Sequence, residues 1–277
     1  MGFLKTLFGG DDLSPEEKKE REEARQFDVF KSDGVRAMRM GQVDYAEKCF
    51  RRALEIKDDL EIHDYLSQVL VHQEKFDEGF DHLNLLAEAQ PDNIHILSTM
   101  AHVAYMKEDY TTMAEVCEKA MLLDKDNAQV LFLYARCSQG QHDLVNAVAM
   151  LTKTIMLDES FAAAYLERGE ILLGMGDVEG ASEDADHLME IADGAEDVLL
   201  FKSRVLMAQG QFAQAIDVLD RAIEGNPFCT AALKARGTCR LALGDKDGAE
   251  RDMRQVLDID PDALSDVSGE FSAEGKD

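Results

Sequence analysis

Apolar residues recur every three or four positions along most of the chain, in short segments that polar turns separate. In residues 196–225, Leu199, Leu206 and Met207 share a face of one segment, and Phe212 and Ile216 share a face of the next. This spacing fits the 3.6-residue period of an amphipathic α-helix. The pattern therefore predicts an all-α chain that is built from pairs of helices.

Small residues recur on top of this pattern at intervals of 33 or 34 residues. One register contains only small residues: Gly34, Ser67, Ala101, Ala135, Gly169, Ser203 and Gly237. A second register lies twelve residues further on and is small except at one methionine: Ala46, Gly79, Met113, Ala147, Ala181, Ala215 and Ala249. Two antiparallel helices need small residues where they cross, because larger side chains would hold the backbones apart. Each unit is predicted to be a helical hairpin.

Glycine and proline mark the ends of the predicted helices. Glycine recurs at the turn inside the hairpin, where a residue with positive φ can end the first helix: Gly41, Gly176, Gly210 and Gly244. Proline recurs just past the second helix: Pro91, Pro227 and Pro261. Ser14 and Glu17 form a capping box with Pro15 at the first helical position, which predicts a helix start ahead of the repeats.

A 34-residue helix–turn–helix unit with these small, apolar and proline positions resembles the tetratricopeptide repeat. The resemblance implies an α-solenoid of antiparallel hairpins, wound into a right-handed superhelix. We expect seven repeats in residues 27–262: 27–59, 60–93, 94–127, 128–161, 162–195, 196–229 and 230–262. Residues 1–26 are predicted to form a leader with a short apolar segment and a charged helix, and residues 263–277 an acidic flexible tail.

The sequence departs from the family pattern at one position of the first helix. Asp33, Arg168, Lys202 and Arg236 occupy places where the family usually has leucine. In the last repeat Lys246 also replaces an aromatic residue of the family pattern. We therefore expect looser packing between repeats at these five residues.

Composition narrows the class of partner. The chain has 29 Lys and Arg residues against 56 Asp and Glu residues, a net charge of −27, so a nucleic-acid partner is not expected. Its five cysteines form no Cys-x-x-Cys pair, and no segment resembles a membrane span or a cleavable signal. These features predict a reducing compartment, and we expect a cytoplasmic protein.

No residue pattern predicts catalysis, a cofactor or a metal. The glycines of residues 174–180 fit a hairpin turn better than a phosphate-binding loop, because no strand precedes them. The acidic residues 258–262 lack the glycine and the glutamate that a calcium loop requires. His95 and His102 lie two helical turns apart, too far to bind one metal ion. We therefore expect a protein that is not an enzyme.

The resemblance implies that the first helices line a concave surface and that the chain is a scaffold or adaptor for a peptide or protein. Two alternatives stay open: a structural homo-oligomer and a subunit of an enzyme complex. A carboxylate clamp for chaperone tails is not expected. Lys31 and Lys234 hold the first lysine position of such a clamp, but Val35 and Thr238 replace its asparagine.

The predicted partner-binding residues lie on the first helices of repeats four to six. Apolar positions there are flanked by charges of alternating sign: Phe132, Leu133, Arg136, Leu166, Glu170, Leu200, Phe201 and Arg204. The alternative is that the apolar members pack against the adjacent repeat. His102 and Tyr105, with Tyr65, are the next candidates, in the N-terminal repeats.

Both ends of the chain carry apolar residues without an evident cover. Residues 3–8 contain an apolar stripe that could contact a membrane or a partner, with a frayed leader as the simpler alternative. The last repeat has no following helix to cover it, so Val256, Leu257 and Ile259 are expected to be partly exposed. This end would take a short helix from Ala263 onward or pair with another molecule.

Overall fold

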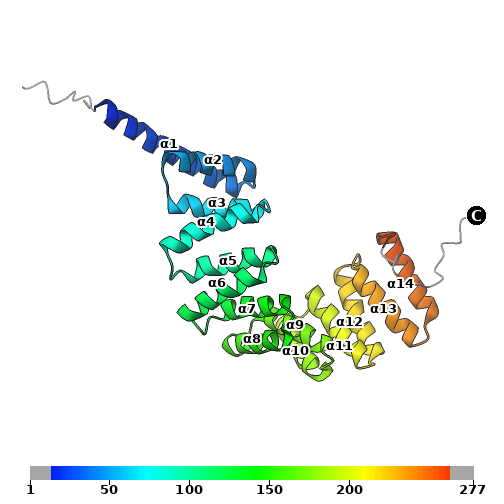
Figure 1. Ribbon diagram of the computed structural model, residues 1–277. Helices are drawn as coiled ribbons and strands as arrows, with labels where there is room; N and C mark the ends of the chain where they lie inside the picture. Colours follow the sequence, from blue (N-terminus) through cyan, green and yellow to red (C-terminus); the bar gives the residue numbers. More distant parts are fainter. Residues whose placement is uncertain (1–13, 263–277) are drawn as a thin grey trace, which may run out of the picture. The chain divides into compact units, whose positions relative to one another are not determined.

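The computed structural model describes residues 14–262; the apolar stripe of the leader and the acidic tail lie outside this range. The described residues form fourteen α-helices and no β-strand (Figure 1). The helices are α1 Pro15–Arg39, α2 Val43–Ile56, α3 Leu60–His72, α4 Phe76–Ala89, α5 Ile94–Met106, α6 Tyr110–Leu123, α7 Ala128–Gly140, α8 Leu144–Leu157, α9 Ala162–Gly174, α10 Val178–Ile191, α11 Glu196–Ala208, α12 Phe212–Gly225, α13 Thr230–Ala242 and α14 Lys246–Ile259.

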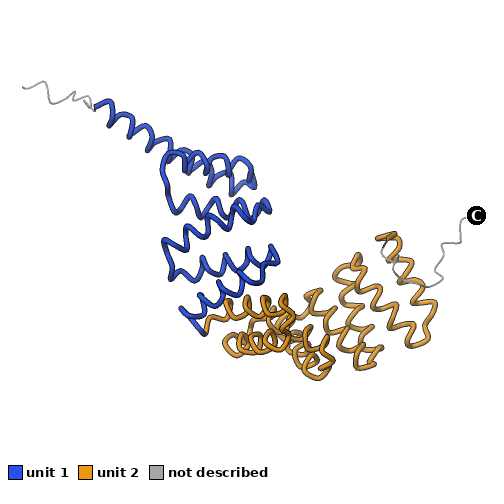
Figure 2. The backbone as a smooth tube through the Cα atoms, viewed as in Figure 1, with its two compact units in different colours: residues 1–125 blue, residues 126–277 orange. Residues whose placement is uncertain are grey.

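Each odd-numbered helix packs against the even-numbered helix that follows it, and each hairpin packs against its neighbour within a unit. The predicted all-α solenoid of helical hairpins is therefore confirmed. We call the odd-numbered helices first helices and the even-numbered ones second helices. The chain divides into two compact units, residues 1–125 and 126–277 (Figure 2). Unit 1 contains α1–α6 and unit 2 contains α7–α14.

The hairpin turn uses a left-handed residue in all seven hairpins of residues 14–262. The four predicted glycines have positive φ, from 70° at Gly41 to 86° at Gly244. The other three hairpins place Glu74, Glu108 and His142 at this position, with φ of 60°, 56° and 62°. A left-handed residue after the last turn lets the chain reverse while the end carbonyls stay hydrogen-bonded.

The N-terminal capping box is also confirmed. The Ser14 hydroxyl accepts from the Glu17 backbone N–H at 3.1 Å, and the Glu17 carboxylate accepts from the Ser14 N–H at 2.6 Å. Pro15 begins α1, which runs without interruption to Arg39. The predicted charged helix and the first helix of the first repeat are thus one continuous helix.

Small residues leave room for large ones, as the spacing predicted. A Cβ atom on Gly34 would overlap the Phe50 ring, and one on Gly169 would overlap the Phe201 ring. Both rings are fully buried. Glycine at these places therefore allows an aromatic side chain to fill the space between helices.

Arg168 and Arg236 make polar contacts where looser packing between repeats was expected. Within its own hairpin Arg168 donates to the Asp184 carboxylate at 2.6 and 3.0 Å, and Arg236 donates in the same way to Asp252 at 2.6 and 3.1 Å. Both aspartates are buried, at 1% and 2% exposure. Each arginine also donates to the preceding repeat, Arg168 to the Thr152 hydroxyl at 3.0 Å and Arg236 to the Asp220 carboxylate at 2.6 Å. These charge-assisted hydrogen bonds join the repeats at two of the positions where the family usually has leucine.

Candidate functional site

The exposed side of α9 and α11 combines apolar and charged side chains in unit 2. On each helix three residues lie four and seven positions apart, which places them on one side of the helix. We call this set the first-helix face: Leu166, Glu170 and Leu173 on α9, and Leu200, Arg204 and Met207 on α11. Arg204 is exposed and the other five are half-buried. The two helices pack against each other, so the face is continuous.

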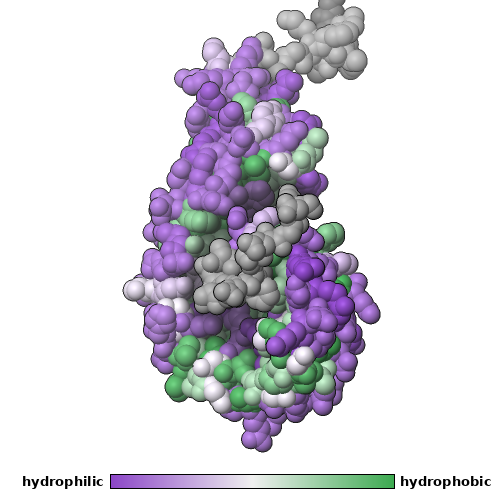
Figure 3. All heavy atoms as spheres, turned by 90° about the vertical axis from the view of Figure 1, so that its right-hand side faces the viewer, coloured by the Kyte–Doolittle hydropathy of each residue, from purple (hydrophilic) through white to green (hydrophobic). Residues whose placement is uncertain are grey.

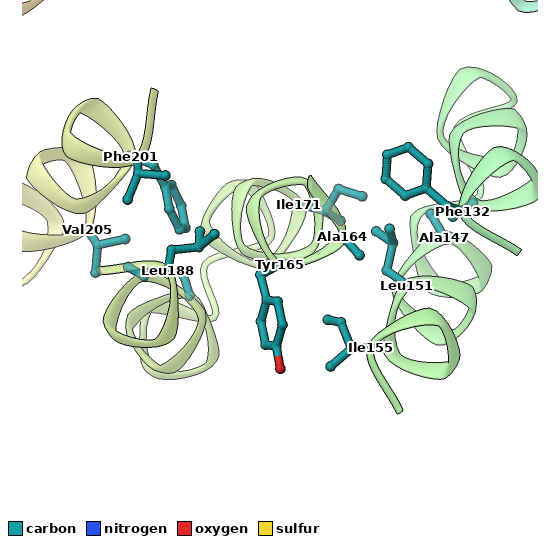
Figure 4. Packing of buried hydrophobic residues seen from close by; sticks show 14 residues of the cluster. Phe132, Ala147, Leu151, Ile155, Ala164, Tyr165, Ile171, Leu188, Phe201 and Val205 are labelled. Carbon is teal, nitrogen blue, oxygen red and sulfur yellow. The ribbon is translucent and has the colours of Figure 1, made fainter. Parts of the chain in front are cut away.

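Three of the predicted apolar residues are absent from this face. Phe132, Leu133 and Phe201 are buried, at 6%, 0% and 0% exposure, so their prediction as surface contacts is wrong. The Phe132 ring packs 4.9 Å from the Phe161 ring, measured between centroids. In Figure 4 the Phe201 ring lies between its own helix and the helix that carries Tyr165. For these three, the alternative of packing within the repeat stack holds. Leu166 and Leu200 also pack against the core but keep partly exposed side chains.

Two residues of the face were missed by the sequence analysis. Leu173 and Met207 lie seven residues after Leu166 and Leu200, two helical turns further along. The helical period therefore identifies both residues when it is continued from Leu166 and Leu200 into the second half of each helix. They add a second apolar row to the first, with the charged residues between the rows.

The predicted alternating charges pair with each other. Glu170 and Arg204 form an ion pair that joins α9 to α11. Arg136, on α7, pairs instead with Glu167 of α9 at 3.1 Å, and its guanidinium lies 5.7 Å from the centre of the Phe132 ring. Because Glu170 and Arg204 are both partly exposed, a bound segment could replace their mutual contact with its own charges.

Glu167 is an unusual carboxylate beside this face. Burial raises its pKa to about 7, although the nearby Arg136 opposes the shift. Its second carboxylate oxygen, Oε2, is buried and has no hydrogen-bond partner. Such a group changes charge near neutral pH, so the charge beside the first-helix face depends on pH in that range.

His102 and Tyr105 belong to unit 1 and not to this face. Both are on α5, where His102 is exposed and Tyr105 is half-buried. The Tyr105 ring lies 6.5 Å from the Tyr110 ring of α6, in an edge-on arrangement. The lysine that holds the first clamp position in this unit, Lys31, donates to Glu61 at 2.5 Å.

Other kinds of site are not found in residues 14–262. The structure shows no group of three or more His, Cys, Asp or Glu side chains that could hold a metal ion in this range. No described helix is long and apolar enough to cross a membrane. All five cysteines are buried and unbridged.

Comparison with known proteins fits this geometry. A family model described as tetratricopeptide repeat matches residues 202–263. This match and the solved structures described below support a tetratricopeptide repeat protein. Proteins of this kind generally mediate protein–protein interactions through extended surfaces, and typically act as non-catalytic scaffolds.

Two curated relatives match parts of the chain. Protein CTR9 homolog of Arabidopsis thaliana is 26% identical over 125 residues, 45% of this chain and 12% of the relative. Tetratricopeptide repeat protein 34 of Homo sapiens is 32% identical over 89 residues, 32% of this chain and 16% of the relative. The matched part is thus a small fraction of either relative.

Solved structures share the fold at low sequence identity. A tetratricopeptide repeat protein of Parabacteroides merdae is 13% identical with a TM-score of 0.68, covering 85% of this chain and 94% of its own. PilW, a type IV pilus biogenesis factor, is 15% identical with a TM-score of 0.65, covering 73% and 94%. YrrB, described as having an unusual peptide-binding site, is 14% identical with a TM-score of 0.57, covering 66% and 94%.

Proposed function

We propose that this tetratricopeptide repeat protein is a non-catalytic scaffold or adaptor that binds a peptide or protein segment on its first-helix face. The observation that carries the proposal is the arrangement of that face. One apolar row, Leu166 and Leu200, and a second, Leu173 and Met207, flank a partly exposed ion pair on adjacent helices.

The apolar and the charged side chains of this face would contribute to binding in different ways. The apolar rows offer area that a partner can remove from water, which supplies affinity. The Glu170–Arg204 pair lies between the rows, so a partner with apolar anchors at the wrong spacing would bury these charges without compensation. YrrB, a fold neighbour described as having an unusual peptide-binding site, supports a peptide as the class of ligand. The five buried, unbridged cysteines support a cytoplasmic location.

A homo-oligomer formed through the last repeat is the second candidate. Leu257 and Ile259 of α14 are half-buried, as the sequence predicted. Val256, which was expected to be partly exposed as well, is fully buried, so the apolar surface at this end is smaller than predicted.

The test is to identify the partner by affinity capture and mass spectrometry, and then to measure its affinity for Leu166→Ser, Leu200→Ser and Met207→Ser proteins. Each lost anchor should cost about 1–3 kcal/mol of binding free energy. Leu243→Ser is the control, because Leu243 is 55% exposed but lies past the end of α13. Unchanged affinity in all three variants, with helix content confirmed by circular dichroism, would refute the proposal.

A further inference from the structure

The outer side of α8 is apolar, although it faces solvent. Val145 and Met156 are 72% and 77% exposed, and Ala149 between them is also exposed. The three residues are four and seven positions apart, so they lie on one side of the helix. We call them the α8 outer face. The only charged residue of α8 is Lys153, which pairs with Asp126 at 3.2 Å.

The repeat itself does not require an apolar residue at these positions. Every other second helix carries at least one exposed acidic side chain among the three equivalent positions, and α8 carries none. In repeat order the equivalents are Asp44, Lys48 and Glu55; Asp77, Asp81 and Glu88; Thr111, Glu115 and Leu122; Glu179, Glu183 and Glu190; Ala213, Asp217 and Glu224; and Asp247, Arg251 and Asp258. Six hairpins therefore fold with charge at this place, and the fold does not account for the apolar α8 outer face.

An acidic helix borders this face within the same unit. On α10, Glu179, Glu183, Asp186 and Glu190 are all exposed. Both α8 and α10 pack against α9, and His187 of α10 contacts the Glu159 carbonyl, two residues after α8, at 3.3 Å. Because neighbouring repeats repeat the same orientation, we infer that the acidic side chains of α10 face the same side of the stack as the α8 outer face. Hydrophilic residues predominate on the side of the molecule shown in Figure 3, where hydrophobic ones gather in patches.

We propose that the α8 outer face docks a basic amphipathic helix of a partner protein. Its apolar side chains would cover Val145, Ala149 and Met156, and its Lys or Arg residues would face the carboxylates of α10. Charge complementarity favours this occupant over a second copy of the chain. A second copy, with a net charge of −27, would bring its own acidic border against the first. The surface is separate from the first-helix face, so the protein would hold two partners.

The test uses two synthetic helical peptides of about five turns. Both have the same leucine stripe, which is flanked by lysines in one peptide and by glutamates in the other. Fluorescence anisotropy with the full chain should show that the lysine peptide binds at least about tenfold more tightly. Val145→Glu/Met156→Glu installs the residues that α10 has at the same positions, so the hairpin should still fold. This variant should lose about tenfold in affinity for the lysine peptide although it gains two negative charges.

Controls separate docking on α8 from general attraction to an acidic protein. Ala213→Glu adds a negative charge at the position of α12 that is equivalent to Val145, and should not weaken binding. Leu166→Ser and Leu200→Ser should not weaken it either, which distinguishes this surface from the first-helix face. Equal or tighter binding of the lysine peptide by the double variant, or by Met156→Glu alone if the double variant unfolds, would overturn the proposal. So would self-association in light scattering that the α8 substitutions abolish.

Discussion

The two units fill the same position of the repeat in different ways. In α3 and α5 of unit 1 the seventh residue of the first helix is Leu66 or Met100, buried at 1% and 5% exposure, and α1 has Asp33 at the equivalent place. In unit 2 the same position carries Tyr134 in α7 and the charged residues Arg168, Lys202 and Arg236 in the three later first helices. Sixteen residues after Met100 is the buried Val116, whereas sixteen residues after Arg168 is the buried Asp184. One place in the fold therefore accepts either an apolar pair or an ion pair.

The two solutions connect the helices differently. Arg168 of α9 donates to Asp184 of α10 and, at 3.0 Å, to the Thr152 hydroxyl of α8, so one side chain links three helices. In unit 1 the ion pairs between repeats, such as Lys75 with Glu47 at 2.9 Å, lie nearer the surface. Exposed pairs contribute little stability, whereas a buried pair is costly to break on one side. Unit 2 should therefore be the more sensitive to loss of a single charged residue.

The largest effect is expected for Asp184→Val. The substitution leaves the Arg168 guanidinium without its main partner in a mostly buried place, which should cost about 3 kcal/mol of unfolding free energy. Urea unfolding followed by circular dichroism measures the loss. A change below about 1 kcal/mol would show that solvent reaches Arg168 and that the pair behaves like a surface one.

The matched double variant Arg168→Met/Asp184→Val completes this experiment. It copies into unit 2 the Met100 and Val116 pair that unit 1 has at the same positions. Because replacing both members of a buried ion pair with apolar residues is often neutral or stabilising, most of the lost stability should return. If it does not, the hydrogen bond to Thr152 contributes more than the pair itself.

A smaller loss is expected for Gly169→Ala. Alanine favours a helix by about 1 kcal/mol over glycine, but its Cβ would overlap the Phe201 ring, and overpacking costs about 1–3 kcal/mol. Unit 1 has Ser67 at this position, and its equivalent of Phe201 is Thr99, which has no ring. Thermal unfolding should show a net loss that Phe201→Leu restores in part.

Gly174→Ala is the control for this substitution. No atom lies within 4 Å of the place its Cβ would take, and Ala208 and Ala242 hold the same position in the next two repeats. Gly174→Ala should be neutral or stabilising. A loss at Gly174 as large as that at Gly169 would mean that helix flexibility, not the Phe201 ring, explains the requirement for glycine.

These contrasts also show which features of the fold the sequence could predict. The spacing of small residues predicts where each hairpin begins and ends along the sequence. The need for positive φ predicts the glycines at the turns. The turns at Glu74, Glu108 and His142 have no such signal. There the fold imposes the left-handed conformation on a residue that does not prefer it.

The candidate site was harder to predict because exposure depends on the neighbouring repeat. Phe201 is buried since Gly169 makes room for it, whereas Leu200, one residue earlier, stays half-exposed. The sequence pattern marks both as apolar and does not show which one the preceding helix covers. Similarly, Arg168 is charged in the sequence but half-buried in the structure, because its buried partner Asp184 lies on another helix.

The smallest predicted effect concerns pH, to which the two units respond in opposite directions. In unit 1 the Nδ1 atoms of His63 and His82 lie 2.7 Å apart, and burial, with the neighbouring His63, lowers the pKa of His82. A lowered histidine pKa means that the unfolded chain binds the proton first, so His82 reduces stability as the pH falls below about 6.5.

Glu167 in unit 2 has the opposite effect. Its pKa rises from 4.5 to about 7, so between these values the folded chain holds a proton that the unfolded chain has lost. The stabilisation by protonated Glu167 is complete below the pKa of this group in the unfolded chain, and it disappears as the pH rises through 7.

The test is the Glu167→Gln variant, which keeps the shape of the protonated form. Its free energy of unfolding should match that of the native protein at pH 5. At pH 8 it should exceed the native protein by on the order of 1 kcal/mol, because the native carboxylate is then charged and its Oε2 atom has no partner. Urea unfolding of both proteins at pH 5 and pH 8 isolates Glu167, since the histidine pair contributes equally to each. An advantage for the native protein at pH 8 would show instead that the Arg136 ion pair outweighs the burial of the charge.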